Sequence, residues 1–395
     1  MLVACGTVEF QKIFVPPLRG RMEFNMGLRV VKRDGLPLWK RAILYLSAVV
    51  LALLIGAAIL LFLGVNPLDY YYQMFTMGTV NNPIAYKTFM NYIKELLPLA
   101  LTSVALSLAF KMRFWNIGGE GQFIVGAITA TYVALAWGPK LPTAVTLILM
   151  CVLAMVTAGL YGLLAGFLKV RFGTNETLLT LMLNYVALYA LYFVGETKAD
   201  WNLFLQEQSA RPVFKSFKDI VAFPMIPIGD KFKLTSCVIF TLLIGVVIFV
   251  YLRYTKHGYE ISVIGDSAGS ARYAGMKVNR IVLRTVFLSA ALIGLAAAFK
   301  VGSAGVLSTA ITDDVGWTGI IVAWLAQLST GMIFLVSALI TVLQFGSTVA
   351  AATFRQVDSS FANMLQGIIL FLVLAADFYT RFRIVRVKKG GRAHE

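Results

Sequence analysis

Long apolar runs, most of them near 20 residues and separated by short polar segments, form the dominant pattern of this chain. A helix of that length crosses a hydrocarbon core of roughly 30 Å. Because the runs are continuous rather than alternating, they predict helices and not the strands of a barrel. We expect ten spans, at 42–64, 93–110, 114–137, 143–167, 174–195, 234–252, 283–305, 317–331, 334–354 and 361–380. The eighth is short, so re-entry is an alternative to a full crossing there.

The basic residues predict the orientation of these spans. Most of the 35 Lys and Arg residues fall in segments that are cytoplasmic if the N-terminus is cytoplasmic, whereas the short outer loops would hold only Lys87, Lys94, Lys140 and Arg355. We therefore expect an all-α polytopic protein with both termini in the cytoplasm. It would comprise a basic cytoplasmic segment 1–41, a membrane domain 42–380 and a basic cytoplasmic tail 381–395. Within the membrane domain, loop 196–233 would be extracytoplasmic and loop 253–284 cytoplasmic.

Composition supports the membrane class and excludes several others. Hydrophobic residues make up 59% of the chain, charged residues 14%, and the mean hydropathy is +0.79. The net charge of +16 is explained by cytoplasmic loops facing anionic lipid headgroups, so it indicates no nucleic-acid partner. Scattered cysteines (Cys5, Cys151, Cys237) and isolated histidines (His257, His394) provide no disulfide framework, metal site or catalytic constellation. We expect neither a cofactor nor an enzyme activity in this chain.

A first polar island interrupts the third span. Asn116 is a good N-cap for a helix that starts near Ile117, and the glycines around Glu120 weaken a continuous helix. A helix N-terminus inside a membrane protein presents free N–H groups to a cavity, and Glu120 is costly facing lipid. Trp115, Asn116 and Glu120 are therefore candidates for a transport pathway. The alternative is a helix start at the cytosolic surface, with Glu120 balancing Lys111 and Arg113.

A second polar island begins the fifth span. Thr174 or Asn175 caps the predicted helix, and Glu176 suits its first turn. Glu176, Thr180 and Asn184 are spaced by four and share one helix face. That face either lines a pathway, with Asn175 and the neighbouring Tyr185, or bonds an adjacent helix.

Other ionisable residues fall in or near the membrane. Lys300 lies within a predicted span, Asp377 is expected to pair with Arg381, and Asp313 and Asp314 are expected in an outer loop. Ala158, Gly162 and Gly166 repeat at a spacing of four, which predicts close helix packing.

A basic, glycine-bearing loop separates the sixth and seventh spans. Its central stretch, 265–276, reads GDSAGSARYAGM and carries charge on the predicted cytoplasmic side. A loop of this kind indicates that something in the cytoplasm docks there. Ser267, Ala271, Arg272, Tyr273, Ala274 and Gly275 are the candidate contact residues.

These motifs resemble those of a known family, the membrane permease subunits of bacterial ABC importers for nucleosides, ribose-type sugars and branched-chain amino acids. Stretch 114–122 is similar to the signature of the nucleoside branch, with Trp115 inserted or shifted, and Asn175-Glu176 followed by 181–185 matches that branch as well. Stretch 265–275 resembles the family's coupling segment, although family members usually carry asparagine in place of Asp266 and a nearby proline. The resemblance covers roughly 96–380.

The resemblance implies a multi-pass permease subunit of the bacterial plasma (inner) membrane that transports nucleosides. ATP would be bound by separate cytoplasmic ABC ATPase subunits, and the chain itself has no Gly-x-x-x-x-Gly-Lys-Ser/Thr loop. The expected partners are that ATPase, a second and different permease subunit, an extracytoplasmic binding lipoprotein and membrane lipid. Polar pathway residues would hydrogen-bond a ribose or base, and Trp115 or Tyr185 would stack on it.

Two other functions stay open at this stage. One is an ABC permease for a simple sugar or for branched-chain amino acids. The other is an ion-coupled secondary transporter, against which the two halves show no paired, symmetric helix interruptions.

Overall fold

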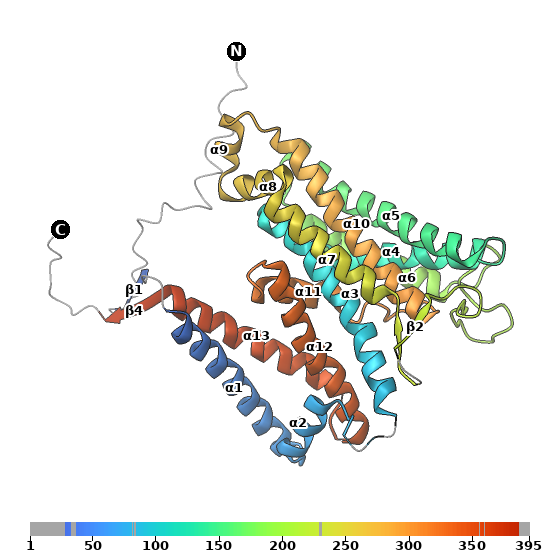
Figure 1. The fold of residues 1–395 in the computed structure, drawn as a ribbon, viewed down its shortest axis with the longest axis horizontal. Coiled ribbons are helices and arrows are strands. Elements are labelled where there is room, and N and C mark those ends of the chain that lie inside the picture. Colours follow the sequence, from blue (N-terminus) through green and yellow to red (C-terminus); the bar gives the residue numbers. More distant parts are fainter. Residues whose placement is uncertain are drawn as a thin grey trace. The chain divides into compact units, whose positions relative to one another are not determined.

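The computed structural model describes residues 28–32, 37–80, 82, 84–228, 231–354, 356–358 and 360–386. Most of the described chain is helical (Figure 1). The described residues group into two compact units, those within 28–62 and 364–386 and those within 63–363. Cys5, His394, Arg355 and most of the predicted basic terminal segments lie outside the described residues.

The smaller unit contains α1 (Leu38–Phe62), most of α13 (Ser360–Arg381) and two short strands. Strands β1 (Leu28–Lys32) and β4 (Phe382–Arg386) pair antiparallel, in a register that runs from Leu28 opposite Arg386 to Lys32 opposite Phe382. The hydroxyl of Tyr45 donates to Oδ1 of Asp377 at 2.9 Å. The expected partner of Asp377, the side chain of Arg381, lies outside the described residues.

The larger unit holds the remaining elements. They are α2 (Pro67–Thr76), α3 (Ala85–Lys111), α4 (Gly119–Trp137), α5 (Thr143–Phe172), α6 (Glu176–Glu196), β2 (Met225–Pro227), β3 (Lys233–Thr235), α7 (Cys237–Tyr254), α8 (Lys256–Asp266), α9 (Ala268–Tyr273), α10 (Val278–Ala304), α11 (Val315–Leu325) and α12 (Thr330–Thr353).

Each of the ten predicted spans falls on one of these helices. In the described part of the chain, eight helices are long and apolar enough to cross a membrane. The third predicted span corresponds to α4, a 19-residue helix whose first turn is polar, and the eighth to α11. With 11 residues, α11 is about 16 Å long, too short to cross alone. The eighth span is therefore shorter than 317–331, and α11 needs a further segment to complete a crossing.

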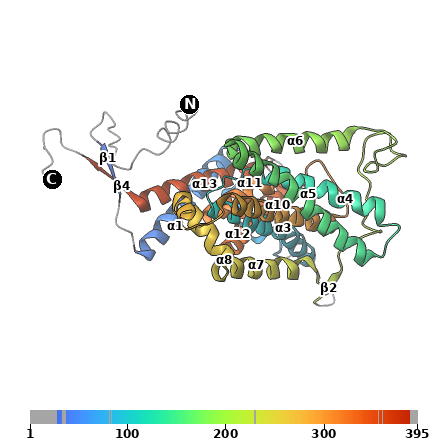
Figure 2. The same cartoon turned by 90° about the horizontal axis from the view of Figure 1, so that it is seen from above.

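Helices α3 and α10 form the buried centre of the larger unit (Figure 2). Small residues allow this packing, because a Cβ on Gly294 of α10 would lie 2.2 Å from the carbonyl oxygen of Ala154 in α5. The predicted small-residue stripe on α5 is part of the same contact, since a Cβ on Gly162 would lie 2.4 Å from that of Ala290.

The long segment between α6 and α7 packs against the C-terminal end of α10. Its strands β2 and β3 pair antiparallel, and Leu205 bridges to Phe214. The N–H of Phe217 donates to the carbonyl of Gly305 at 2.9 Å. This segment closes one end of the helix bundle rather than extending freely from it.

Helix α11 runs alongside the second half of α3 and in the same direction. Oδ2 of Asp313, just before α11, lies 2.7 Å from Nζ of Lys300, and Lys300 also pairs with Glu95 in the first half of α3. At its other end, the ring of Trp324 lies 5.8 Å from that of Phe110. Residues 305–314 thus return from the end of α10 partway along the bundle before α11 begins.

Candidate functional site

The chain between α3 and α4 folds into a tight, side-chain-bonded turn. Asn116 and Gln122 form a reciprocal amide pair, with N···O distances of 3.1 and 3.0 Å, and both are buried. Oδ1 of Asn116 also accepts from the N–H of Gly118 at 3.1 Å. This pairing satisfies buried polar groups at the start of α4, as a helix N-terminus inside a membrane protein requires.

Helix α6 supplies the remaining partners for the start of α4. Thr180 accepts from the N–H of Ile117 at 3.2 Å, while Asn184 donates to the carbonyl of Ile117 and accepts from the N–H of Gly121, both at 2.8 Å. A Cβ on Gly121 would lie 3.0 Å from Cα of Asn184, so glycine permits the approach. Of the two interpretations of this face, the structure shows the bond to a neighbouring helix. A pathway role for Asn116 and Asn184 stays a prediction.

Glu120 joins α4 to α11. Its Oε2 accepts from the N–H of Gly316 at 2.8 Å. A Cβ on Gly316 would lie 2.3 Å from the backbone nitrogen of Glu120. The carboxylate therefore lies at the positive N-terminal end of α11, which favours its charge. The alternative that Glu120 balances Lys111 and Arg113 is not what the described residues show, because its carboxylate instead accepts from the N–H of Gly316.

The other four predicted pathway residues lie nearer the surface of the chain. Asn175 caps α6 by accepting from the N–H groups of Thr177 and Leu178, at 3.0 and 3.3 Å, and Glu176 pairs with Lys169. Trp115 and Tyr185 are 46% and 51% exposed. The ring of Trp115 stacks on that of Trp324, with centroids 5.2 Å apart. The structure thus brings Asn116, Glu120 and Asn184 together and leaves these four at the periphery.

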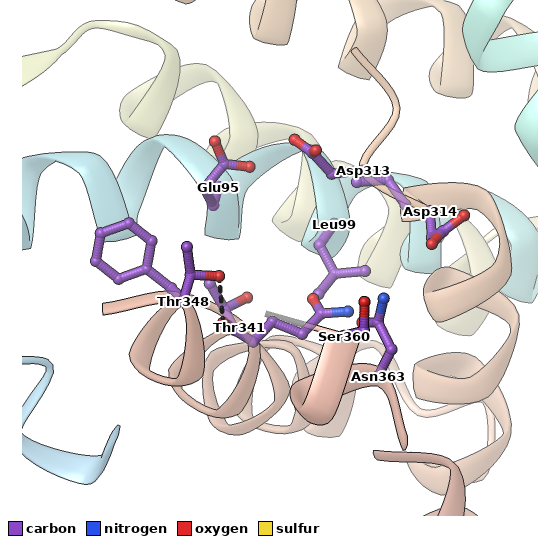
Figure 3. A pocket seen from close by; sticks show the side chains of 11 residues that line it. Glu95, Leu99, Asp313, Asp314, Thr341, Thr348, Ser360 and Asn363 are labelled. Atoms are coloured by element: carbon purple, nitrogen blue, oxygen red, sulfur yellow. Dashed lines mark hydrogen bonds between the residues drawn. The ribbon is translucent and has the colours of Figure 1, made fainter. Parts of the chain in front are cut away.

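A polar cavity that the sequence did not predict lies between α3 and α12, with the start of α11 and the start of α13 (Figure 3). Its volume is about 380 Å³. Figure 3 shows carboxylates of Glu95, Asp313 and Asp314 along one side and Thr341, Thr348, Ser360 and Asn363 facing them. Lys300, Asp313 and Asp314 were the charged residues in the sequence that could have pointed to this cavity. The sequence alone did not indicate that Lys300 contacts Asp313.

The predicted cytoplasmic loop is a pair of helices, α8 and α9, at one end of the bundle (Figure 1). Ser267 separates them and caps α9 by accepting from the N–H of Ser270 at 3.2 Å. Tyr273 is 97% exposed, whereas Ala271 is fully buried. A Cβ on Gly265 would lie 2.0 Å from the carbonyl oxygen of Lys111, so α8 contacts the end of α3 backbone to backbone.

A second contact joins α8 to α10. Nη2 of Arg284 donates to Oε2 of Glu260 at 3.0 Å, and His257 lies 3.4 Å from the same oxygen. Desolvation alone would raise the pKa of Glu260, but the hydrogen bond and the positive charge of Arg284 bring it below its usual value. Glu260 is therefore ionised at neutral pH, and α8 is connected to both central helices of the bundle.

Metal-binding groups are not gathered in this part of the chain. Across the described ranges, no group of three or more His, Cys, Asp or Glu side chains is placed to hold a metal ion. The polar residues described above are suited to hydrogen bonding rather than to metal coordination.

Comparisons with known proteins agree with this architecture. The family model described as "Branched-chain amino acid transport system / permease component" matches residues 88–374. The chain is 27% identical to the glucose ABC transporter permease protein TsgB13 of Haloferax volcanii, over 91% of this chain and 94% of that protein. It is 28% identical to the guanosine permease NupP of Bacillus subtilis, over 88% and 96% respectively.

A third relative is the nucleoside ABC transporter permease NupB of Lactococcus lactis, 26% identical over 78% of this chain and 84% of that protein. No solved structure matches the chain. The family match covers most of the helices described above, including both central ones. The chain therefore belongs to the branched-chain amino acid transport system permease family, and it is a multi-pass ABC permease subunit of the bacterial inner membrane.

Proposed function

We propose that this chain forms part of the translocation pathway of an ABC importer for nucleosides. One observation carries this choice of substrate. The two motifs that resemble the nucleoside branch, 114–122 and 181–185, are bonded to each other through Asn184, Ile117 and Gly121. Two relatives carry guanosine and nucleoside in their names, which supports the same choice.

In this proposal the energy comes from a separate pair of ABC ATPase subunits in the cytoplasm. They would dock on α8 and α9, where Tyr273, Arg272 and Ala274 are exposed. Movement of α8 would then reach α3 through the Gly265–Lys111 contact and α10 through the Glu260–Arg284 pair. Because these two helices form the centre of the bundle, a small shift of α8 would alter the polar cavity beside α3.

The complete importer would contain two further proteins. A second, different permease subunit would complete the pathway, and an extracytoplasmic binding lipoprotein would deliver the substrate. Trp115 and Tyr185 are exposed aromatic faces on which a base would stack. Asn116, Glu120 and Asn184 would act on transport mainly by holding α4, α6 and α11 together, with Asn175 and Glu176 at the start of α6.

A simple sugar is the second candidate substrate, because the glucose permease relative matches nearly the whole chain. The deciding experiment measures uptake of labelled inosine in cells that carry this chain, its ATPase and its binding protein. Excess guanosine should compete, whereas glucose, arabinose and leucine should not. Competition by glucose but not by guanosine would assign the sugar instead.

The energy source is tested with the same cells. Inactivating the phosphate-loop lysine of the ATPase should abolish uptake, while collapsing the ion gradient at constant ATP should leave it unchanged. Uptake that survives loss of the ATPase and stops with the gradient would show a secondary transporter.

A further inference from the structure

The carboxylates that line the cavity beside α3 are only partly neutralised by a positive charge. Lys300, which is 7% exposed, pairs with both Glu95 and Asp313 and so neutralises part of their charge. Asp314 lines the same cavity and, in the part of the chain that the structure describes, forms no hydrogen bond or ion pair through its carboxylate. Although Asp314 precedes α11, its side chain does not cap that helix. The cavity therefore holds excess negative charge and free acceptor oxygens.

The opposite wall contains a buried hydroxyl with no partner. Thr341 of α12 is 2% exposed, its Oγ1 forms no hydrogen bond, and it lines the cavity (Figure 3). Neighbouring hydroxyls are already engaged, since Thr348 donates to the carbonyl of Gln344 and Ser360 to Asp358. Buried polar groups are nearly always hydrogen-bonded, so an unpaired one facing a cavity marks a place for a ligand.

We propose that Asp314 and Thr341, on different walls of the cavity, bind hydroxyl groups of a neutral ligand, the ribose ring of a nucleoside. This inference rests on the proposed function and specifies the part of the substrate that the cavity contacts. Hydroxyl groups donate to a carboxylate and both donate to and accept from a threonine hydroxyl. The volume of about 380 Å³ lies in the range of small-molecule sites.

The charge of the cavity also determines which ligands it rejects. A phosphate or a free carboxylate would meet the uncompensated Asp314 and the carboxylates of Glu95 and Asp313. Nucleotides and other anions are therefore disfavoured relative to nucleosides and neutral sugars. Chelation of a metal ion is disfavoured too, because the acidic side chains in the described ranges do not converge as a metal site.

The test uses the full-length chain in lipid nanodiscs with inosine as the probe. Saturation-transfer NMR detects weak binding and reports which ligand protons contact the protein. The ribose H2′ and H3′ protons should receive more saturation than the base protons, and 2′,3′-dideoxyinosine should bind about tenfold more weakly. Inosine monophosphate and leucine should not displace inosine.

Two near-isosteric variants locate the contact. Asp314→Asn should weaken inosine binding about tenfold and Thr341→Val by about fivefold. Thr241→Val is the matched control, because Thr241 is also a buried hydroxyl without a partner but lies on α7, away from the cavity. Asp219→Asn is the control for loss of an exposed carboxylate. Neither control should alter binding.

Three outcomes would overturn the proposal. They are equal binding of inosine and its dideoxy analogue, equal effects of Thr341→Val and Thr241→Val, and displacement of inosine by Ca²⁺, which would indicate a cation site. The proposed function fails separately. If ribose and inosine bind at Asp314 but the assembled importer takes up no nucleoside, the binding site is supported and the nucleoside function is not. If the importer takes up nucleoside and the Asp314→Asn variant does so equally well, the nucleoside function is supported and the binding site is not.

Discussion

Asn184 shows how one side chain on α6 fixes the start of another helix. Its amide group bonds to both the carbonyl of Ile117 and the N–H of Gly121, and it is 5% exposed. In a membrane neither backbone group finds water as a replacement partner. The asparagine therefore has a structural role that does not depend on substrate, which separates it from a residue that only lines a pathway.

Replacing Asn184 by Ala should lower the free energy of unfolding by about 1–2 kcal/mol, because two buried backbone groups lose their partner. Thermal unfolding of the purified protein measures the change. Met182→Ala is the control on the same helix, because Met182 is 52% exposed and its loss should cost less. Unchanged stability of Asn184→Ala together with altered substrate uptake would instead support a direct pathway role.

Gly316 is a residue where backbone proximity, and not flexibility, requires glycine. Gly316→Ala would place a methyl group 2.3 Å from the backbone nitrogen of Glu120, so α4 and α11 must separate. We expect a loss of about 1–3 kcal/mol, measured as a lower unfolding temperature. Gly331→Ala is the matched control, since nothing lies within 4 Å of its Cβ position. Equal stability of the two variants would show that the α4–α11 contact is loose.

At the scale of elements, α8 and α9 form the candidate connection between a cytoplasmic motor and the bundle. The Gly265–Lys111 contact and the Arg284–Glu260 pair join α8 to the two most buried helices. The exposed part of α9 is left for a partner. Tyr273 is the best probe because its side chain is 97% exposed and makes no packing contribution that its loss would remove.

Tyr273→Ala should reduce uptake about tenfold or more while leaving the amount of folded protein unchanged, because one aromatic anchor at a docking surface commonly contributes that much. Uptake and ATP hydrolysis by the assembled importer are the measurements. Tyr254→Ala is the control, since Tyr254 is 71% exposed at the end of α7 but lies outside α9.

Normal uptake by Tyr273→Ala would argue against docking on this face of α9. A substitution of Gly275 is less informative. Gly275 has a φ of +76°, so a larger residue such as Arg would strain the turn after α9 in addition to blocking a surface.

The sequence predicts the helices well because each apolar run carries its own signal. Asn175 as a cap and the shared face of Thr180 and Asn184 are also local patterns, and the structure contains both. The contact of Glu120 with Gly316 could not be predicted, because the partner is a backbone N–H 196 positions away. The cavity could not be predicted for the same reason, because α3 is far in the sequence from the other helices that line it.

At the scale of the whole molecule, the number of crossings depends on α11. The helix is too short to cross alone, yet its C-terminal end lies near the start of α12, in a group that includes Lys111 and Arg253 at the ends of α3 and α7. Residues 305–314 supply the first part of the path. We therefore predict that the two segments together make one crossing, which gives ten in all and both termini on the same side of the membrane.

Cysteine labelling of intact vesicles tests this topology. In a background with Cys5, Cys151 and Cys237 replaced by Ala, Thr309→Cys should react with a membrane-impermeant maleimide from the outer face only, and Ser329→Cys from the cytoplasmic face only. Lys140→Cys is the control for the outer face and Arg272→Cys the control for the cytoplasmic face.

If Ser329→Cys reacts from the outside, α11 turns back without crossing. Helices α12 and α13 would then run the opposite way, and the chain would have nine crossings with its termini on opposite sides. Because α8 and α9 precede this region in the chain, they would stay on the same side of the membrane. The result would therefore change the view of the translocation pathway and not of the proposed ATPase contact.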